Sequence, residues 1–317
     1  MKILSIIKFL ILNMVLIIGF TSIAISKTSV QSCNRTVTFD SVPKKAISND
    51  VNLTEMVLVL CLSDRMVGYT GISGWKTLDE EMRKGVKELP ELSSKYPSKE
   101  VLIGADADFF FAGWNYGMKV GGPVTPETLK PFGIKVYELT ESCTHIMKKN
   151  KASIDDMYND LLNLGKIFKI EDKANSIVKS YRNELASLTK NIQSKDPLKV
   201  FVYDSGEDTP FTAGLYAMPT ALIEAAGGKN VMDNFRKSWG TVTWEEVIDR
   251  NPEVIVIVNY GNVTAEQKRE FMMTNPAFAE IDAVKNDRFV TLEYVEATPG
   301  PRNIKAVKKL VKSFWKK

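Results

Sequence analysis

The stretch from residue 200 to residue 247 limits the possible folds of this chain more than any other part. It opens with four β-branched and aromatic residues, 200–203, which predict a buried strand. A polar turn follows, and residues 219–226 then show a helical pattern that stops at the two glycines 227–228. Open α/β sheets usually place their ligand beside such a strand end, so this stretch predicts a ligand-binding loop.

The same order of strand, polar loop and helix recurs along the rest of the chain. Residues 52–62, between two apolar runs, follow the apolar pattern of a helix. Strands that alternate with helices favour mainly parallel sheets, and 317 residues are enough for about two such units. The further strands are expected at residues 35–39, 46–48, 65–69, 109–112, 136–139, 254–258 and 289–292.

Between the two groups of strands, residues 153–168 predict one long amphipathic helix. Ser153, followed by two aspartates, provides a helix start, and apolar residues recur every three or four positions behind it. A helix of this length is a rod of roughly 24 Å, at about 1.5 Å per residue. A second helix is expected at 172–193, before a break at Pro197.

The N-terminus carries the pattern of an export signal. Lys2 and Lys8 accompany an apolar run that reaches Phe20, and residues 24–26 fit a small-x-small cleavage site. We therefore expect residues 1–26 to be a secretory signal peptide. An uncleaved N-terminal anchor is the alternative, because the apolar run is close to the length that spans a membrane. Removing this segment lowers the formal net charge from +4 to about +2, which argues against nucleic acid as a partner.

Three cysteines fit a protein that works in an oxidising compartment. Cys61 lies in the apolar helix predicted at residues 52–62 and is expected to be buried. Cys33 could be the lipidated cysteine of a lipoprotein. Against this, residues 30–32 make a poor lipidation motif and lie well beyond the apolar run. Cys143 is the third cysteine.

Several segments, taken in order, resemble one known family. They are CNRTVTFDSVPKKAI, LTEMVLVLCLSDRMVGYTG, YPSKEVLIGADADFFFAGW, YDSGEDTPF, IEAAGGKNV, the pattern W-x-x-V-T-W-E-E-V, NPEVIVIV and TPGPRNIKAVKKL. Their order and spacing resemble the solute-binding proteins of bacterial ABC importers, in the class that takes iron–siderophore complexes, haem and corrinoids. The resemblance runs through nearly the whole chain.

The resemblance implies an α/β fold of two Rossmann-like lobes. Mainly parallel sheets form the lobes, a long helix joins them, and the ligand cleft lies between them. The implied parts are a signal peptide at 1–26, an N-terminal lobe at 27–152, an inter-lobe helix at 153–168 and a C-terminal lobe at 169–317.

Two pairs of residues acquire roles from the resemblance. It implies a disulfide between Cys33 and Cys143. It also implies that Glu100, in YPSKEVL, and Glu245, in VTWE, pair with arginines of a membrane permease. Both glutamates lie near predicted helix N-termini, where a carboxylate also stabilises the helix by about 0.3–1 kcal/mol. A local structural role is therefore the alternative for each.

Aromatic residues recur at the predicted strand ends of both lobes, where the loops of two sheets can face each other. Such rings suit a large, planar or macrocyclic ligand, since each buries about 150–250 Å², although each could instead pack within its own lobe. By the resemblance, Arg302 could meet an anionic ligand group or else be structural, and Lys76 and Lys119 are weaker candidates. The expected aromatic ligand residues are Tyr69, Trp75, Trp114, Tyr116, Tyr203, Phe211, Tyr216, Trp239 and Tyr260.

Sequence patterns for catalysis and for a resident metal are mostly missing. His145 is the only histidine; it could ligate a haem iron from the edge of the first lobe or be an ordinary surface residue. Asp204 opens a D-S-G sequence, but the aspartic-protease mechanism needs two carboxylates and the chain has no second such sequence. Neither G-x-S-x-G nor H-E-x-x-H occurs. We expect no catalytic residue and no metal site.

The sequence and the resemblance together predict the solute-binding component of an ABC importer, in the periplasm or on the outer face of the cytoplasmic membrane. We expect a monomer without a cofactor, which captures a ferric siderophore or related metal chelate and delivers it to an inner-membrane permease. The alternatives are haem or cobalamin on the same scaffold, and a secreted hydrolase that uses Asp204 and His145.

Overall fold

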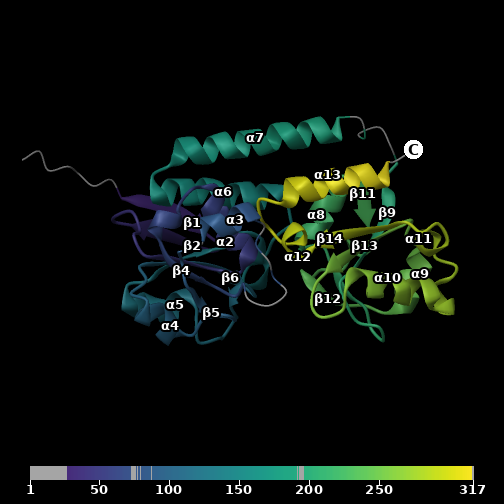
Figure 1. Cartoon of the computed structure of the whole chain (residues 1–317), viewed down its shortest axis with the longest axis horizontal. Coiled ribbons are helices and arrows are strands. Elements are labelled where there is room, and N and C mark those ends of the chain that lie inside the picture. The colour runs from purple at the N-terminus through teal and green to yellow at the C-terminus, as the bar shows by residue number, and fades with distance from the viewer. Residues whose placement is uncertain are drawn as a thin grey trace, which may run out of the picture.

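The structure of the chain is a computed structural model, and it describes residues 27–315 apart from 73–75, 77, 79, 87, 191 and 193–195. The expected signal peptide and the predicted ligand residue Trp75 lie outside the described residues. Two parallel sheets organise the described part of the chain (Figure 1). We call the part that carries the six-stranded sheet the first lobe, and the part that carries the four-stranded sheet the second lobe.

The first lobe combines a parallel sheet with a two-stranded antiparallel ribbon. Its strands are β1 (Thr28–Ser32), β2 (Arg35–Phe39), β3 (Ala46–Asn49), β4 (Met66–Thr70), β5 (Glu91–Ser93), β6 (Phe109–Trp114), β7 (Gly117–Met118) and β8 (Lys135–Glu138). Its helices are α2 (Val51–Val59), α3 (Glu80–Gly85), α4 (Lys99–Gly104) and α5 (Pro126–Leu129). The sheet runs β5-β4-β3-β6-β7, with β8 also on β6, and every pairing in it is parallel, as predicted.

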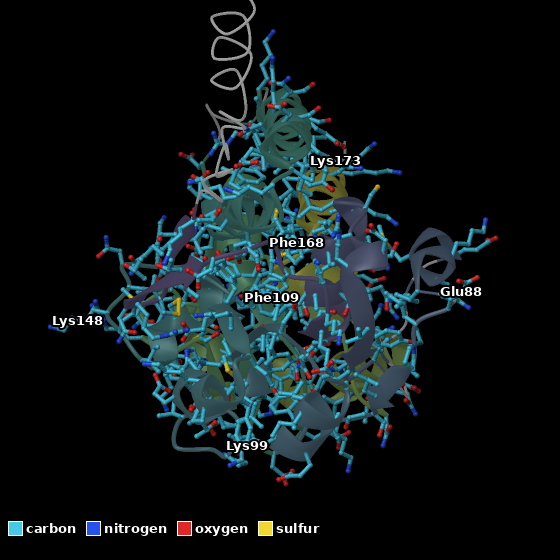
Figure 2. All side chains as sticks on the ribbon, turned by 90° about the vertical axis from the view of Figure 1, so that its left-hand side faces the viewer. Glu88, Lys99, Phe109, Lys148, Phe168 and Lys173 are labelled. Carbon is cyan, nitrogen blue, oxygen red and sulfur yellow. A yellow bond between two sulfur atoms is a disulfide. The ribbon has the colours of Figure 1, made fainter. Side chains whose placement is uncertain are left out.

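Strand β6 lies at the centre of this sheet, and all six of its residues are buried. Phe110 belongs to one apolar cluster, and Phe109 and Phe111 belong to another, because successive side chains point to opposite faces. A continuous apolar run is the pattern of a parallel strand covered on both faces. Figure 2 shows Phe109 and Phe168 in the interior of the protein, while Lys173 lies at its periphery.

The second lobe combines a four-stranded parallel sheet with a separate antiparallel ribbon. Its strands are β9 (Leu198–Tyr203), β10 (Phe211–Ala213), β11 (Gly228–Asn230), β12 (Trp239–Thr241), β13 (Val254–Asn259) and β14 (Phe289–Glu293). Its helices are α8 (Met218–Ala225), α9 (Trp244–Arg250), α10 (Ala265–Thr274), α11 (Asp282–Lys285), α12 (Tyr294–Ala297) and α13 (Asn303–Phe314). The sheet runs β11-β9-β13-β14, and β10 pairs with β12 in the ribbon.

Two helices bridge the lobes, α6 (Ile154–Phe168) and α7 (Glu171–Thr189). Just before α6, the N–H of Ala152 donates to the carbonyl of Leu215 in the second lobe. At the other end of α6, the ring of Phe168 meets Phe109 of the first lobe edge-on, 5.3 Å away. Helix α7 packs back along α6, and Figure 1 shows both helices on the same side of the two lobes. The helix predicted at 153–168 is thus confirmed to within one residue.

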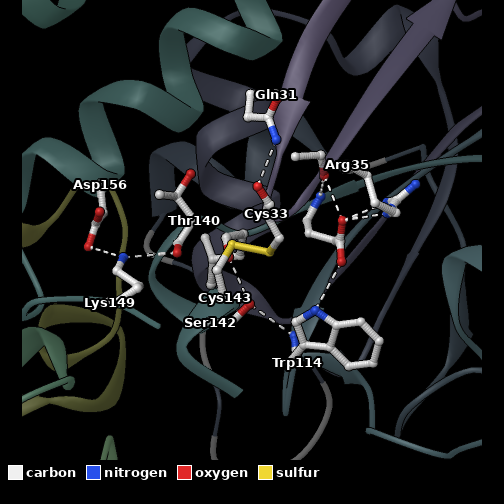
Figure 3. The surroundings of a disulfide bond; sticks show 12 residues. Gln31, Cys33, Arg35, Trp114, Thr140, Ser142, Cys143, Lys149 and Asp156 are labelled. Carbon is white, nitrogen blue, oxygen red and sulfur yellow. Dashed lines mark hydrogen bonds and ion pairs between the residues drawn. A yellow bond between two sulfur atoms is a disulfide. The ribbon is translucent and has the colours of Figure 1, made fainter. Parts of the chain in front are cut away.

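A disulfide fixes the N-terminal ribbon to the first lobe. It joins Cys33, in the turn between β1 and β2, to Cys143, and the two Cα atoms are 5.2 Å apart. The resemblance implied this pairing. Beside it, the buried carboxylate of Glu138 accepts from the Ser32 hydroxyl at 2.9 Å and pairs with Arg35 at 2.6 Å (Figure 3). The covalent bond and the polar cluster therefore hold the ribbon at the end of β8.

The prediction that Cys61 is buried is wrong. Its thiol is free and exposed. Helix α2 ends at Val59, three residues earlier than the apolar pattern suggested. Cys61 then adopts a left-handed backbone conformation, with φ of 55°, which turns the chain out of the helix and leaves the side chain at the surface.

Candidate ligand-binding cleft

The carboxyl ends of strands from both lobes meet at a hollow of about 380 Å³. Tyr96 follows β5, and Asn115 and Tyr116 follow β6, so these three line the hollow from the first lobe. Trp239 in β12 and Tyr260 after β13 line it from the second lobe. Ligands of open α/β sheets usually bind beyond the carboxyl ends of the strands, and the fold therefore explains the position of this hollow.

A second hollow, of about 620 Å³, continues the first. Tyr96, Asn115, Tyr260 and Tyr294 line both. The additional lining residues are mostly charged, namely Asp50, Lys76, Lys95 and Lys119. The two hollows form one inter-lobe cleft with an aromatic inner part and a lysine-rich outer part.

Two aromatic pairs of the second lobe form flat surfaces in this cleft. The rings of Phe211 and Trp239 stack with centroids 6.1 Å apart and an interplanar angle of 10°. Antiparallel pairing of β10 with β12 brings these two residues together. The rings of Tyr260 and Tyr294 lie 5.3 Å apart at 31°. Broad ring faces of this kind suit a large ligand with planar or apolar surfaces.

Charged groups beneath the second-lobe wall support the cleft. The buried ammonium group of Lys268 donates to the carbonyls of Val258 at 2.7 Å and of Tyr260 at 3.0 Å. Burial lowers the pKa of Lys268. The carboxyl group of Asp204 also lines the hollow and accepts from the Ser205 hydroxyl at 2.8 Å, and burial raises its pKa. Lys268 thus holds the end of β13 in place beside Asp204.

Polar contacts cross from one lobe to the other beside the outer part of the cleft. The Tyr294 hydroxyl donates to Asp50 at 2.8 Å, and the ammonium group of Lys76 pairs with the same carboxylate at 2.5 Å. The side-chain amide of Asn52 donates to the carbonyl of Pro299 at 2.7 Å. These contacts join the start of α2 to the segment around α12.

Comparison with known proteins identifies the family. The family described as periplasmic binding protein matches residues 121–296, which is more than half of the chain. The chain belongs to the periplasmic binding protein family.

Individual relatives of this periplasmic binding protein agree with that assignment. An uncharacterized ABC transporter substrate-binding lipoprotein of Bacillus subtilis (strain 168) is 25% identical over 286 residues, 89% of this chain and 83% of that protein. The vitamin B12-binding protein of Vibrio parahaemolyticus is 23% identical over 279 residues, with 86% and 89% covered. The crystal structure of a periplasmic binding protein from Veillonella parvula has a TM-score of 0.79 at 28% identity, and covers 91% of this chain and 98% of that chain.

Family membership fixes the general role. This periplasmic binding protein is the solute-binding component of an ABC transporter. It works outside the cytoplasm together with a membrane permease, and it is not an enzyme. The hydrolase alternative for Asp204 and His145 is therefore set aside. No helix in the described part of the chain combines the length and apolar character needed to cross a membrane.

The structure brings four of the predicted ligand residues together in the cleft, which are Tyr116, Phe211, Trp239 and Tyr260. Tyr69 packs half-buried against the first-lobe core, and Tyr216 is half-buried away from the cleft lining. Tyr203 ends β9 in the second-lobe core, with its ring 5.3 Å from that of Trp244. The cleft positions predicted for Tyr69, Tyr203 and Tyr216 are corrected accordingly.

Two further predictions are corrected by side-chain contacts. Trp114 is 6% exposed, and its indole N–H donates to Glu138 at 3.0 Å inside the first lobe, so it does not line the cleft (Figure 3). The guanidinium of Arg302 lies outside both hollows of the cleft, where its Nε donates to the buried carboxylate of Glu55 at 2.9 Å. This contact favours the structural alternative for Arg302, which also lines a small hollow together with Lys76 and Tyr294.

The sequence analysis did not predict three residues that line the cleft, which are Tyr96, Asn115 and Ser238. Tyr96 follows β5, which is three residues of mixed polarity and gave no strand signal. Its hydroxyl donates to the carbonyl of Asn115. His145, considered only as a candidate iron ligand or surface residue, is exposed at the cleft and lies 3.3 Å from the Asn115 amide.

The proposed docking glutamates lie on different lobes. Glu100 is exposed in the first turn of α4, where the Ser98 hydroxyl lowers the pKa of its carboxyl group. Glu245 is exposed in the first turn of α9, which Thr243 caps. Figure 1 shows α4 and α9 away from α7, one of the two helices that bridge the lobes. Their role in docking remains a prediction.

A separate hollow of about 430 Å³ lies among α6, α7 and α8. Exposed ion pairs form part of its rim, between Lys151 and Glu224 at 2.6 Å and between Arg182 and Asp155 at 3.1 Å. None of the predicted ligand residues lines it. Among the described residues there is also no group of three or more side chains suited to hold a metal ion.

Proposed function

We propose that this periplasmic binding protein captures a ferric siderophore, or a related metal chelate, in the inter-lobe cleft and delivers it to its permease. The observation that carries the proposal is the aromatic wall of the cleft. Phe211, Trp239, Tyr260 and Tyr294 present ring faces from one lobe, and Tyr96 and Tyr116 complete the lining from the other. A large chelate with flat organic arms would bury these rings between the lobes.

The lysines at the outer part of the cleft favour an anionic ligand. Lys95 and Lys119 are exposed there, and Lys76 lies deeper beside Asp50. The ammonium group of Lys119 lies 5.9 Å from the centre of the Tyr96 ring, so charge and aromatic surface occur side by side. A chelate with net negative charge would be attracted to this edge before it enters. In this proposal the metal arrives inside the ligand and the protein carries no cofactor.

Haem or cobalamin is the second candidate. The imidazole of His145 lies in the cleft lining and could coordinate an open axial position of the metal. The relative from Vibrio parahaemolyticus is named as a vitamin B12-binding protein, which supports the same class of ligand. His145→Ala would then lower affinity for haem or cobalamin and leave the binding of a coordinatively saturated ferric siderophore unchanged.

We further propose that the chain is exported by residues 1–26 and acts as a monomer in the periplasm or on the outer face of the cytoplasmic membrane. The lysines and apolar run at the N-terminus support the export signal. Mass spectrometry of the mature protein tests it, because cleavage after Ser26 predicts an N-terminus at Lys27. Lipid on Cys33 would contradict both the cleavage site and the disulfide.

Intrinsic tryptophan fluorescence tests the ligand. Trp239 lies in the cleft, so a bound iron chelate should quench its emission. Titrations should use a ferric hydroxamate, a ferric catecholate, haem and cyanocobalamin, each with the parent protein and with Trp239→Phe. Saturable quenching by a ferric siderophore, largely lost in the variant, is the expected result. Quenching by haem or cobalamin alone would support the second candidate, and no saturable binding of any of the four would refute the proposal.

A further inference from the structure

One buried acid lies where the two lobes meet behind the cleft. Glu141 begins the 3-10 turn Glu141–His145 of the first lobe and is 1% exposed. Its Oε1 accepts a hydrogen bond from the Ser238 hydroxyl of the second lobe at 3.4 Å, and Ser238 itself lines the cleft. Its Oε2 is buried without a hydrogen-bond partner. An ionised carboxylate there would lack most of the donors that it needs.

The second lobe meets this carboxyl group with the start of a helix. Helix α8 begins at Met218, and its N-cap residue Ala217 makes no side-chain hydrogen bond. The backbone N–H of Met218 instead faces Glu141. Glu141 therefore lies at the N-terminus of a second-lobe helix that has no side-chain cap of its own, although Glu141 belongs to the first lobe. This contact, like the one with Ser238, exists only while the lobes keep their present arrangement.

The first lobe supplies the charged and titratable neighbours of Glu141. Lys149 favours its ionised form and Asp156 opposes it, but these two are paired with each other at 2.7 Å. The Tyr116 hydroxyl is close enough for the negative charge of Glu141 to add to the effect of burial, which raises the pKa of Tyr116 well above its usual range. Burial dominates at Glu141 itself and raises the pKa of its carboxyl group to about 8.

We propose that Glu141 is a proton-dependent latch between the lobes, which holds the cleft closed while its carboxyl group is neutral and releases it on ionisation. The neutral carboxyl group loses little free energy in this water-free site, so it keeps its contacts with the second lobe. Separation of the lobes stabilises the ionised carboxylate, because water can then solvate both of its oxygens. This inference rests on the proposed function, in that a latch matters for transport only if the ligand sits between the lobes.

The direction of the pH effect follows from the two protonation states. The pKa of Glu141 is about 8 with the lobes together and should return toward 4.5 when they separate. Closing therefore takes up a proton. The neutral Glu141 stabilises the closed state fully below about pH 4.5, and this stabilisation is lost as the pH rises through about 8. Within this window the ratio of closed to open protein should fall by up to about tenfold per pH unit, since one proton is involved.

Spin-label distances in the ligand-free protein test the latch directly. One label can be placed on Cys61, the free exposed thiol of the first lobe, and another on Met273→Cys, an exposed position of α10 in the second lobe. In the parent protein, a population with longer distances should grow between pH 6 and pH 9. In Glu141→Gln, which stays neutral, the short distance should persist over the whole range.

Asp160→Asn is the matched control. Asp160 is also buried, and its pKa is also raised, to about 7, but its hydrogen-bond partners Tyr137 and Thr140 belong to the first lobe. This variant should keep the pH response of the parent. If Glu141→Gln does not fold, Ser238→Ala replaces it, and loss of the second-lobe partner should lengthen the distances already at pH 6.

Each outcome bears on the latch or on the proposed function, but not on both. A ligand-free distance that does not change with pH overturns the latch, whatever the cleft binds. A pH response that survives Glu141→Gln assigns the effect to another group and also overturns it. Titration of the same samples with ferric siderophores, haem and cobalamin then tests the cleft. A distance that responds to pH in a protein that binds none of them would refute the proposed function alone.

Discussion

At the scale of single residues, the ring pair Phe211 and Trp239 gives the sharpest prediction. Phe211→Ala removes half of the stacked surface on the second-lobe wall. Binding should weaken by roughly 1–3 kcal/mol, the cost of losing one buried aromatic contact. Fluorescence titration measures this loss with the best ligand from the panel.

Trp114→Phe is the control for that prediction. It removes the indole N–H that donates to Glu138 within the first lobe. Trp114 does not line the cleft, so this contact is not part of the ligand site. The melting temperature should fall while ligand affinity stays unchanged, because a buried acceptor loses its donor. An equal loss of affinity in both variants would contradict the assignment of Phe211 to the ligand wall.

Lys268 carries a second residue-scale prediction. Lys268→Met keeps the length of the side chain but leaves the carbonyls of Val258 and Tyr260 without their donor. Ligand binding should weaken by about 1 kcal/mol because the Tyr260 loop is no longer fixed. The exposed Lys285, paired with Glu280 on the same lobe, provides the control variant Lys285→Met, which should bind normally.

A double-mutant cycle separates this positioning role from general destabilisation. In a Tyr260→Ala background, Lys268→Met should cost no further affinity, because the ring that it positions is absent. Fully additive losses would show that Lys268 acts elsewhere. Isothermal titration with the same ligand gives all four affinities of the cycle.

At the scale of secondary-structure elements, the sequence was most informative where the pattern was local. The central strand β6 follows from its run of apolar residues, and α6 follows from its cap at Ser153 and its apolar stripe. Trp114 and Tyr203 were placed wrongly because a residue at a strand end can face either the cleft or the core. Only packing against distant groups, such as Glu138 with Trp114, decides between them.

Contacts between lobes could not be predicted from local patterns at all. Glu141 and Ser238 are 97 residues apart, and Asp50 and Tyr294 are 244 residues apart. A buried acid also has no sequence signal of its own, since its surroundings come from both lobes. The family resemblance carried the pairing of Cys33 with Cys143, which the cysteines alone left open.

The disulfide gives the element-scale prediction. It closes a loop across 110 positions of the chain, and its removal should cost about 2–5 kcal/mol of folding stability. The double variant Cys33→Ala with Cys143→Ala should therefore melt at a lower temperature, measured by circular dichroism. Ligand affinity at 25 °C should hardly change, because the ribbon lies outside the cleft lining. A marked loss of affinity with unchanged stability would contradict this separation.

At the scale of the whole molecule, we predict that docking on the permease uses one exposed glutamate from each lobe. Glu100→Ala with Glu245→Ala should leave affinity for the soluble ligand intact and lower ligand uptake in cells. Two such charge pairs would orient the protein on its permease and speed the encounter in a salt-dependent way. Uptake of the radiolabelled chelate by a strain that lacks its own copy provides the measurement.

Glu171→Ala with Glu266→Ala is the matched control for docking. Both residues are also exposed glutamates in the first turns of helices, α7 and α10. Like the docking pair, they stabilise their helices through the helix dipole, but they have no proposed contact with the permease. If the control pair lowers uptake as much as the docking pair does, local helix stability explains the result and the docking role is wrong.

The order of the three cysteines has a consequence for biogenesis. If the chain leaves the cytoplasm N-terminus first, Cys33 and Cys61 emerge well before Cys143, and both can meet an oxidant while the first lobe is incomplete. The earliest bond open to Cys33 is then a wrong one, and thiol–disulfide exchange must replace it once Cys143 arrives. Cells without a disulfide isomerase should accumulate mispaired protein, and Cys61→Ser should restore the yield. Equal yields of parent and Cys61→Ser in such cells would show that Cys33 forms no disulfide with Cys61 before Cys143 is exported.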